Sequence, residues 1–233
     1  MPSWNIHLAV AKEVNKKLKL NKNSFYFGNT VPDVDYGMKA IRKETHFYNT
    51  ICKKCPSEKL PDIKRFLSMY KNKLDNPLIM GTLVHILTDY YYNNEIFTKH
   101  WIQDEKHNVV GIKLKNNKIK FISPDDNETK KFYKHHDLEL YGKYLFNKGL
   151  IEFPIKDNKI FKNALDLKDN LYEKEDIARR LKYLNEEYIY KNKYTLKEKI
   201  FGLNYKMIDK EEQDKLFANC VSYILNEIAN IKK

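Results

Sequence analysis

Residues 77–92 read PLIMGTLVHILTDYYY, and this stretch decides the fold. Its apolar side chains would cover most of the circumference of a helix with Pro77 at its first position, so we expect a helix that is buried nearly all round. One line of small and polar residues interrupts the apolar surface at helical spacing: Gly81, Thr82, His85, Thr88, Asp89 and Tyr92. A buried imidazole and carboxylate four residues apart must either pair with each other or hold a metal ion, because an isolated buried charge is costly.

The composition favours one mostly helical domain. The chain has 233 residues, of which 42% are apolar, and only seven Gly and seven Pro. This is enough apolar material for a full core, and tight turns are few. We therefore predict an all-α fold in a single domain spanning 1–233, with further core helices in 148–233.

The net charge of +12 favours anionic partners such as phosphate esters, nucleic acid or an anionic lipid surface. Lysines recur throughout the chain rather than in one block, so most of them are expected to face solvent. The most apolar stretch, 78–92, is shorter than the ~20 residues that a bilayer requires. The N-terminus also lacks a basic segment followed by an apolar one, so we expect neither a signal peptide nor a transmembrane segment.

Three cysteines cannot form a complete disulfide framework, which favours a reducing, cytoplasmic compartment. A single Cys-x-x-Cys pair is too little for a zinc knuckle. Cys52 and Cys55 are therefore expected to be free loop thiols rather than partners of His46 in a zinc site.

Apolar positions three and four apart predict the other helices, which span 3–20, 62–74, 126–147, 173–192 and 210–231. Ser3 is the expected N-cap of the first. A loop is expected at 27–33, with Gly28 free to adopt a positive φ. Alternating apolar and polar residues around Asn116 and Asn117 predict a small β-hairpin within 112–121.

Three further residues extend the pair His85 and Asp89 to a candidate metal site. His7 lies on the apolar face of the first helix, Asp33 closes the loop, and His46 follows it. Zinc prefers His and carboxylate ligands drawn from several segments. The sequence therefore predicts a metal site formed by His7, Asp33, His46, His85 and Asp89, and the alternative is a hydrogen-bonded His–Asp pair in a helical core.

Four fragments carry a family resemblance through their order in the chain: Trp4-Asn-Ile-His7, Gly28-Asn-Thr-Val-Pro-Asp33, Thr45-His46-Phe47 and Gly81-x-x-x-His85-x-x-x-Asp89. Together they resemble the zinc-dependent phospholipase C family, whose helical fold is shared with single-strand-specific nucleases. The resemblance covers about 4–145. It implies that Asp33, His46, His85 and Asp89 bind one zinc and that His7 binds a second, with Asp89 as a bridge.

The activity implied by this resemblance is hydrolysis of a phosphoric ester, by a phospholipase C-like or phosphodiesterase reaction. Two or three zinc ions would activate a water and offset the charge on the phosphoryl oxygens, and Asp33 would orient or deprotonate that water. Phospholipids, nucleotides and nucleic acid are the substrates to consider.

Two departures from the family pattern stand out. Family members use a mature N-terminal Trp whose free amine completes a metal site, whereas Trp4 lies three residues after Met1. The family also places a further His soon after His-x-x-x-Asp, and here the corresponding position is Glu95.

The run KHHDLE at 134–139 is the candidate for the missing ligands, and it allows two registers. His135 and Glu139 have the spacing of the family pattern. Helical phase instead turns His136 and Asp137 inward, and we favour these two as catalytic residues. His100 and His107 lie beside charged residues and are expected at the surface.

A different class of protein also fits the sequence. The chain would then be a non-enzymatic basic helical module that binds nucleic acid or an anionic surface and keeps only a structural metal site. Nucleic-acid binding by such a module would weaken steeply as salt rises.

Overall fold

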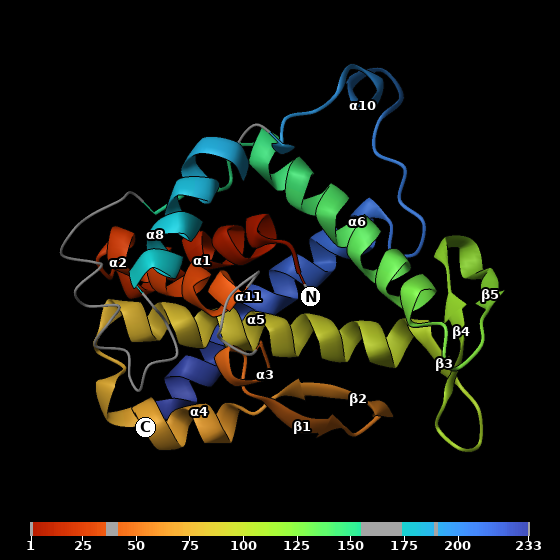
Figure 1. Ribbon diagram of the computed structural model, residues 1–233, viewed down its shortest axis with the longest axis horizontal. Helices are drawn as coiled ribbons and strands as arrows, with labels where there is room; N and C mark the ends of the chain where they lie inside the picture. The colour runs from red at the N-terminus through yellow and green to blue at the C-terminus, as the bar shows by residue number, and fades with distance from the viewer. Residues whose placement is uncertain (1, 36–41, 155–173, 189–190, 233) are drawn as a thin grey trace.

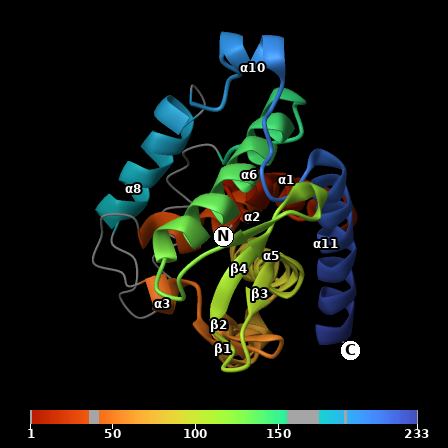
Figure 2. The same cartoon turned by 90° about the vertical axis from the view of Figure 1, so that its right-hand side faces the viewer.

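The computed structural model describes residues 2–35, 42–154, 174–188 and 191–232, and its fold is mostly helical with small antiparallel sheets. Helix α5 (Pro77–His100) crosses the middle of the molecule (Figure 1). On one side of it lie α1 (Trp4–Leu18), α2 (Lys22–Thr30) and α6 (Asn127–Asn147), and on the other lies α4 (Ile63–Tyr70). The C-terminal helix α11 (Lys210–Ile231) packs against both α1 and α5 (Figure 2).

Several of these helices match the sequence prediction closely. Helix α11 begins after Asp209, whose side chain accepts a hydrogen bond from the backbone N–H of Glu212. Helix α5 is buried along its first four turns, as expected, but it continues to His100, two turns beyond the predicted stretch. Its start is fixed by Asn76, which accepts a hydrogen bond from the backbone N–H of Leu78.

The expected loop at 27–33 is largely helical, which corrects the prediction for Gly28. This glycine lies inside α2, and the 3₁₀ helix η1 (Val31–Asp35) follows. A Cβ atom on Gly28 would collide with the carbonyl of Leu78, and one on Gly81 would collide with the carbonyl of Phe25. The two glycines therefore allow the backbones of α2 and α5 to come into contact. Neither glycine is needed for a positive φ.

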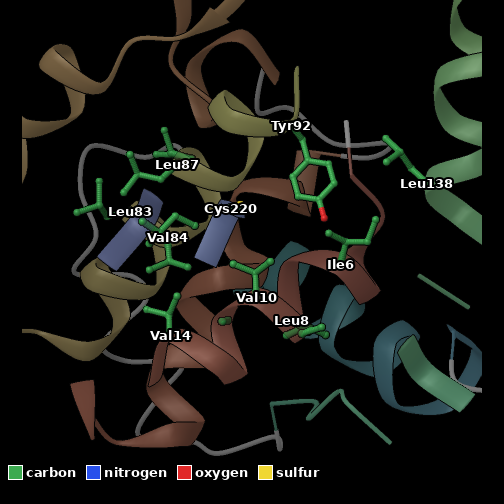
Figure 3. Packing of buried hydrophobic residues seen from close by; sticks show 14 of the residues in the cluster. Ile6, Leu8, Val10, Val14, Leu83, Val84, Leu87, Tyr92, Leu138 and Cys220 are labelled. Atoms are coloured by element: carbon green, nitrogen blue, oxygen red, sulfur yellow. The ribbon is translucent and has the colours of Figure 1, made fainter. Parts of the chain in front are cut away.

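The hydrophobic core lies between α1, α5, α6 and α11 (Figure 3). It includes ten labelled side chains with almost no exposure to solvent: Ile6, Leu8, Val10, Val14, Leu83, Val84, Leu87, Tyr92, Leu138 and Cys220. Burying each large apolar side chain stabilises the fold by about 1.5–3 kcal/mol. The site residues on α1 and α5 are thus held by helices that are anchored in this core.

Two small antiparallel sheets lie beside the helices. Strand β1 (Tyr48–Cys52) pairs with β2 (Cys55–Pro61), a hairpin that the sequence analysis did not predict. Cys52 and Cys55 face each other at its turn and are buried free thiols, so they lie on strands rather than in a loop. The predicted hairpin is confirmed as β4 (Val109–Lys113) and β5 (Ile119–Phe121), joined by η3 (Lys115–Asn117), and β3 (Trp101–Gln103) adds a third strand.

The remaining elements are short: α3 (Arg42–Thr45), η2 (Lys71–Lys73), α8 (Lys174–Tyr183), the π-helical turn η4 (Leu184–Tyr188) and α10 (Leu196–Phe201). Helix α8 with η4 corresponds to the helix predicted at 173–192, of which 173, 189 and 190 lie outside the described residues. Across the described residues, no helix combines the length and apolar character that crossing a bilayer demands.

Candidate metal centre

Five buried polar side chains converge above the middle of α5. His7 comes from α1, Asp33 from η1 and His46 from the residue after α3, while His85 and Asp89 are one turn apart on α5. Asp33 is the most exposed of them, at 5%. The structure therefore brings together all five residues that the sequence singled out as metal ligands.

The ligand atoms form two groups that share His85. Within the described residues, His7, His85 and Asp89 make one group, and Asp33, His46 and His85 make the other, with the atoms of each group within 4.8 Å of one another. Buried His and Asp side chains in this arrangement could hold a metal ion, since a zinc ion takes such ligands at about 2.0–2.2 Å.

The two oxygens of Asp89 face different histidines. Oδ1 lies 3.3 Å from Nε2 of His7, while Oδ2 lies 3.8 Å from Nε2 of His85 and 3.9 Å from Nε2 of His46. On the other side, Oδ1 of Asp33 lies 3.1 Å from Nε2 of His46. A carboxylate placed between three imidazoles in this way can bridge two ions.

Neighbouring groups orient the imidazole rings. Nδ1 of His85 lies 2.7 Å from the carbonyl oxygen of Asn29, so this nitrogen carries the proton and Nε2 presents its lone pair to the carboxylates. Nδ1 of His46 lies 2.8 Å from Oγ1 of Thr45, which leaves its Nε2 facing Asp33. These outer contacts give both rings the orientation that a metal ligand needs.

Unsatisfied buried atoms show that the site fits a cation. Nε2 of His7, Nε2 of His85 and Oδ1 of Asp89 are buried without a hydrogen-bond partner among the described residues. Leaving a buried polar atom unpaired costs about 1–3 kcal/mol. These three atoms belong to one of the two ligand groups, so a single cation between them would satisfy all of them.

The electrostatics of the site favour a neutral His85 beside an ionised Asp89. Burial, followed by the neighbouring His7, lowers the pKa of His85 to about 3. The ring of His7 stacks on that of His85 at 3.8 Å between centroids, which disfavours charge on His85. Although burial alone would raise it, contacts with His7, His85 and His46 hold the pKa of Asp89 well below its usual range. His85 and Asp89 are thus in the protonation states that bind metals.

A chain of polar side chains, which sequence reasoning missed, leads outward from Asp89. The hydroxyl of Tyr48 donates to Oδ2 of Asp89 at 3.4 Å, and Nδ2 of Asn93 donates to that hydroxyl at 3.3 Å. Nζ of Lys134 on α6 then donates to Oδ1 of Asn93 at 3.3 Å. Asn93 lies four residues after Asp89 and continues the polar line of α5, a signal from which it could have been found.

A cavity of about 1580 Å³ adjoins the site, and Asp33, Tyr48 and Asn93 form part of its wall. Its basic lining residues are Lys59, Lys130, Lys131, Lys134, Lys143, Arg179, Lys182 and Lys191, and its acidic ones are Asp33, Glu58, Glu139 and Glu187. Cations therefore outnumber carboxylates on the wall. Several of the cations come from α8 and the residues after it, a part of the chain to which the sequence analysis assigned no site.

Trp4 does not stand at a free chain end in this site. It is the first residue of α1, and its ring packs against Tyr183 at 5.8 Å and Tyr188 at 4.9 Å. All three rings line the cavity. This tryptophan thus belongs to an aromatic wall that joins α1 to α8 and η4.

The carboxylate of Asp137, which was expected in a catalytic role, is occupied by backbone hydrogen bonds. Asp137 is fully buried, as helical phase predicted, but its carboxylate accepts hydrogen bonds from the backbone N–H groups of Lys206, Met207 and Ile208. With three backbone donors fixing both oxygens, the side chain holds the segment before α11 in place and faces no ligand group.

His136 also turns towards this segment, since its Nε2 lies 3.1 Å from the carbonyl oxygen of Asn204 and its ring stacks on Phe132. It reaches only the cavity lining, as do His135 and Glu139 of the other register. None of these three joins a metal-ligand group among the described residues. The ligand groups of the described chain therefore include none of the residues that were expected to hold a third ion.

His100 is a buried residue, not the surface residue that was expected. It is 5% exposed, and its ring nitrogens contact the carbonyl oxygen of Lys113 at 3.0 Å and Oε1 of Glu212 at 3.2 Å. It thereby joins the end of α5 to β4 and α11. His107 is exposed, as predicted.

Comparison of the chain with protein-family models, with curated proteins and with solved structures finds no match.

Proposed function

We propose that this protein is a metal-dependent phosphoric ester hydrolase that uses zinc. The observation that carries the proposal is the pair of buried ligand groups sharing His85, of which one contains Asp33 at the wall of a cation-rich cavity. The resemblance of the four site fragments to zinc-dependent phospholipases C supports the same reaction and the same phospholipase C-like fold.

The ligand assignment follows the two groups. His7, His85 and Asp89 would hold one zinc, which takes the single free lone pair of His85, and Asp33 and His46 would face the other, with Asp89 between them. A zinc ion in such a site would lower the pKa of a bound water molecule. It would also place positive charge opposite the phosphoryl oxygens.

The protein's own groups prepare the site for an ester. Asp33 lies between the buried histidines and the cavity, so its carboxylate is placed to orient an entering water and to accept its proton. Lys134 is held by Asn93 at the cavity wall, where its ammonium group can bind a phosphoryl oxygen. The excess of cations on the wall favours an anionic substrate, such as a phospholipid headgroup or a nucleotide.

The test is the metal content of protein purified without chelator, measured by elemental analysis on the wild type and on Asp89→Asn. We expect two zinc ions per wild-type chain, loss of metal in the variant, and loss of hydrolysis of bis(p-nitrophenyl) phosphate. Asp75→Asn is the matched control, because this aspartate is fully exposed and lies outside both ligand groups.

Two outcomes would contradict the proposal. Wild-type protein that folds without bound metal would leave the five buried side chains as a structural polar cluster. Wild-type protein that holds zinc but hydrolyses neither the model diester nor phospholipids and oligonucleotides would favour a structural metal in a basic binding module. Salt-dependent binding of nucleic acid would then identify that module.

A further inference from the structure

Helix α10 (Leu196–Phe201) projects from the body of the molecule beyond the end of α6 (Figures 1 and 2). Its three large apolar side chains face outward: Leu196 is 75% exposed, Ile200 64% and Phe201 78%. Leu196 and Ile200 lie one turn apart on the same face, and Phe201 follows directly. Exposed apolar residues are common when scattered, but three on one six-residue tip form a patch that marks a contact surface.

The tip is a built element rather than a loose loop. Thr195 and Glu198 form a complete capping box, in which each side chain binds the other residue's backbone N–H. Nζ of Lys143 on α6 contacts both oxygens of Glu198 at 2.7 Å. These bonds fix the helix with its apolar side chains turned away from the core.

The charge around the apolar side chains is positive. Lys197 and Lys199 are exposed and make no ion pair among the described residues, and Lys193 is exposed just before the helix. The one acidic residue of the tip, Glu198, is already paired with Lys143. An outward apolar cluster flanked by lysines matches the boundary between anionic headgroups and acyl chains of a bilayer.

We propose that α10 is an anchor for an anionic phospholipid surface, in which Leu196, Ile200 and Phe201 enter the headgroup region while Lys197 and Lys199 contact lipid phosphates. Interfacial insertion needs a depth of only about 5–10 Å, which a single short helix supplies. A stable protein partner would require about 800 Å² on each side. Three side chains on a projecting tip favour the lipid surface over such a partner.

Anchoring would also place the cavity at the lipid surface. Lys143, which holds Glu198, is itself part of the cavity wall, so α10 is fixed directly to the rim of the cavity. The anchor does not depend on hydrolysis. Its test therefore measures binding, and its result is separate from the result of the metal and activity measurements.

The experiment is co-sedimentation of the full chain with vesicles of phosphatidylcholine alone and of equal parts phosphatidylcholine and phosphatidylserine. We expect binding to the mixed vesicles that weakens with added salt, and weaker binding to phosphatidylcholine alone. The variant Leu196→Ser/Ile200→Ser/Phe201→Ser should lose at least about 10-fold in partitioning, because it removes the inserted apolar surface. Phe121→Ser is the matched control, since Phe121 is 74% exposed on β5, away from α10.

A second measurement reports insertion directly. In Phe201→Trp, the added indole should shift its emission to shorter wavelength when mixed vesicles are added, because it leaves water. Unchanged emission, or equal sedimentation of the triple variant and the wild type, would overturn the proposal. Self-association through α10 in place of vesicle binding would overturn it as well, by identifying a second copy of the chain as the partner.

Discussion

At the level of single residues, His85 has the surroundings of a buried histidine that could hold a metal ion. Its Nδ1 is occupied by the carbonyl oxygen of Asn29, and burial together with the stacked ring of His7 keeps it neutral. Its Nε2 is left without a hydrogen bond among the described residues, at a position common to both ligand groups. A structural His–Asp pair would place this nitrogen at hydrogen-bond distance from its carboxylate, whereas Oδ2 of Asp89 is 3.8 Å away.

Tyr48→Phe tests the outer support of Asp89. The substitution keeps the ring that stacks on His46 but removes the hydroxyl that donates to Oδ2 of Asp89. We expect zinc affinity to fall about 10-fold, the lower end for loss of an outer-shell hydrogen bond. Titration of the apo-protein against a competing chelator measures this change.

The control for that measurement is Tyr133→Phe on α6. Tyr133 is half-buried, and its hydroxyl forms no hydrogen bond among the described residues. Equal zinc affinities of the Tyr48 and Tyr133 variants would show that the hydroxyl of Tyr48 does not support Asp89.

The cysteines give a prediction about reactivity with pH. Burial raises the pKa of Cys55 to about 11 and that of Cys220 well above its usual value. A raised pKa keeps a thiol protonated, and the thiolate is the reactive form, so both should resist alkylation at about pH 8. In denaturant, where the thiol pKa returns to about 8.5, all three cysteines should react. Mass spectrometry after iodoacetamide treatment counts them, and rapid labelling of Cys55 in the native protein would contradict its buried placement.

Sequence patterns were sufficient to name the five candidate ligand residues that the structure brings together, but not their outer contacts. Helical periodicity relates residues of one helix, which is why His85 and Asp89 were found together. Tyr48 lies on a strand whose pairing is not visible in local pattern, so its contact with Asp89 was missed. For Asp137, the phase of α6 correctly indicated an inward side chain, but phase cannot say which backbone groups an inward carboxylate will meet.

At the level of elements, the crossing of α2 and α5 positions Asn29 for its contact with His85. Gly81→Ala places a methyl group against the carbonyl of Phe25, and the backbones must separate to admit it. We expect a loss of about 1–3 kcal/mol in the free energy of unfolding, measured by denaturant titration, and weaker zinc binding because the Asn29 carbonyl moves.

Gly111→Ala provides the comparison for this crossing. Gly111 lies in β4, where a Cβ atom would meet the side chains of Ile102 and Ile119 at ordinary contact distance. This variant should therefore lose less stability than Gly81→Ala. Equal losses would show that the close approach of α2 and α5 is not what the glycine at 81 provides.

The helices and strands differ in how well the sequence predicted them. Helices α5 and α11 carry long apolar patterns and side-chain caps, so they were predicted from pattern alone. Strand β2 begins at Cys55 and contains two prolines, which argue against a strand, and it forms because β1 pairs with it. Gly28 was assigned to a loop because glycine is read first as a turn residue, whereas here the approach of another helix requires it.

At the scale of the whole molecule, the last third of the chain closes the cavity and completes the core. Helix α8 and the turn η4 supply cations and aromatic rings to the cavity wall, and α11 packs against α1 and α5. The segment between α10 and α11 is attached to α6 through Asp137. This buried carboxylate therefore holds the connection between α10 and α11 against α6.

Asp137→Asn separates a structural role from a catalytic one. The carboxylate of Asp137 accepts from the backbone N–H groups of Lys206, Met207 and Ile208. The Asn side chain keeps one oxygen as an acceptor but replaces the other with an NH₂ group. At least one of the three buried N–H groups then faces a donor and loses its hydrogen bond. We expect the free energy of unfolding to fall by about 2–4 kcal/mol, the cost of losing one or two hydrogen bonds to a charged group. The metal content of the folded protein should stay at its wild-type value, because Asp137 belongs to neither ligand group. Asp125→Asn, on an exposed turn before α6, should change neither quantity. If Asp137→Asn instead lost its bound metal while keeping the wild-type stability, Asp137 would have a role in the metal centre.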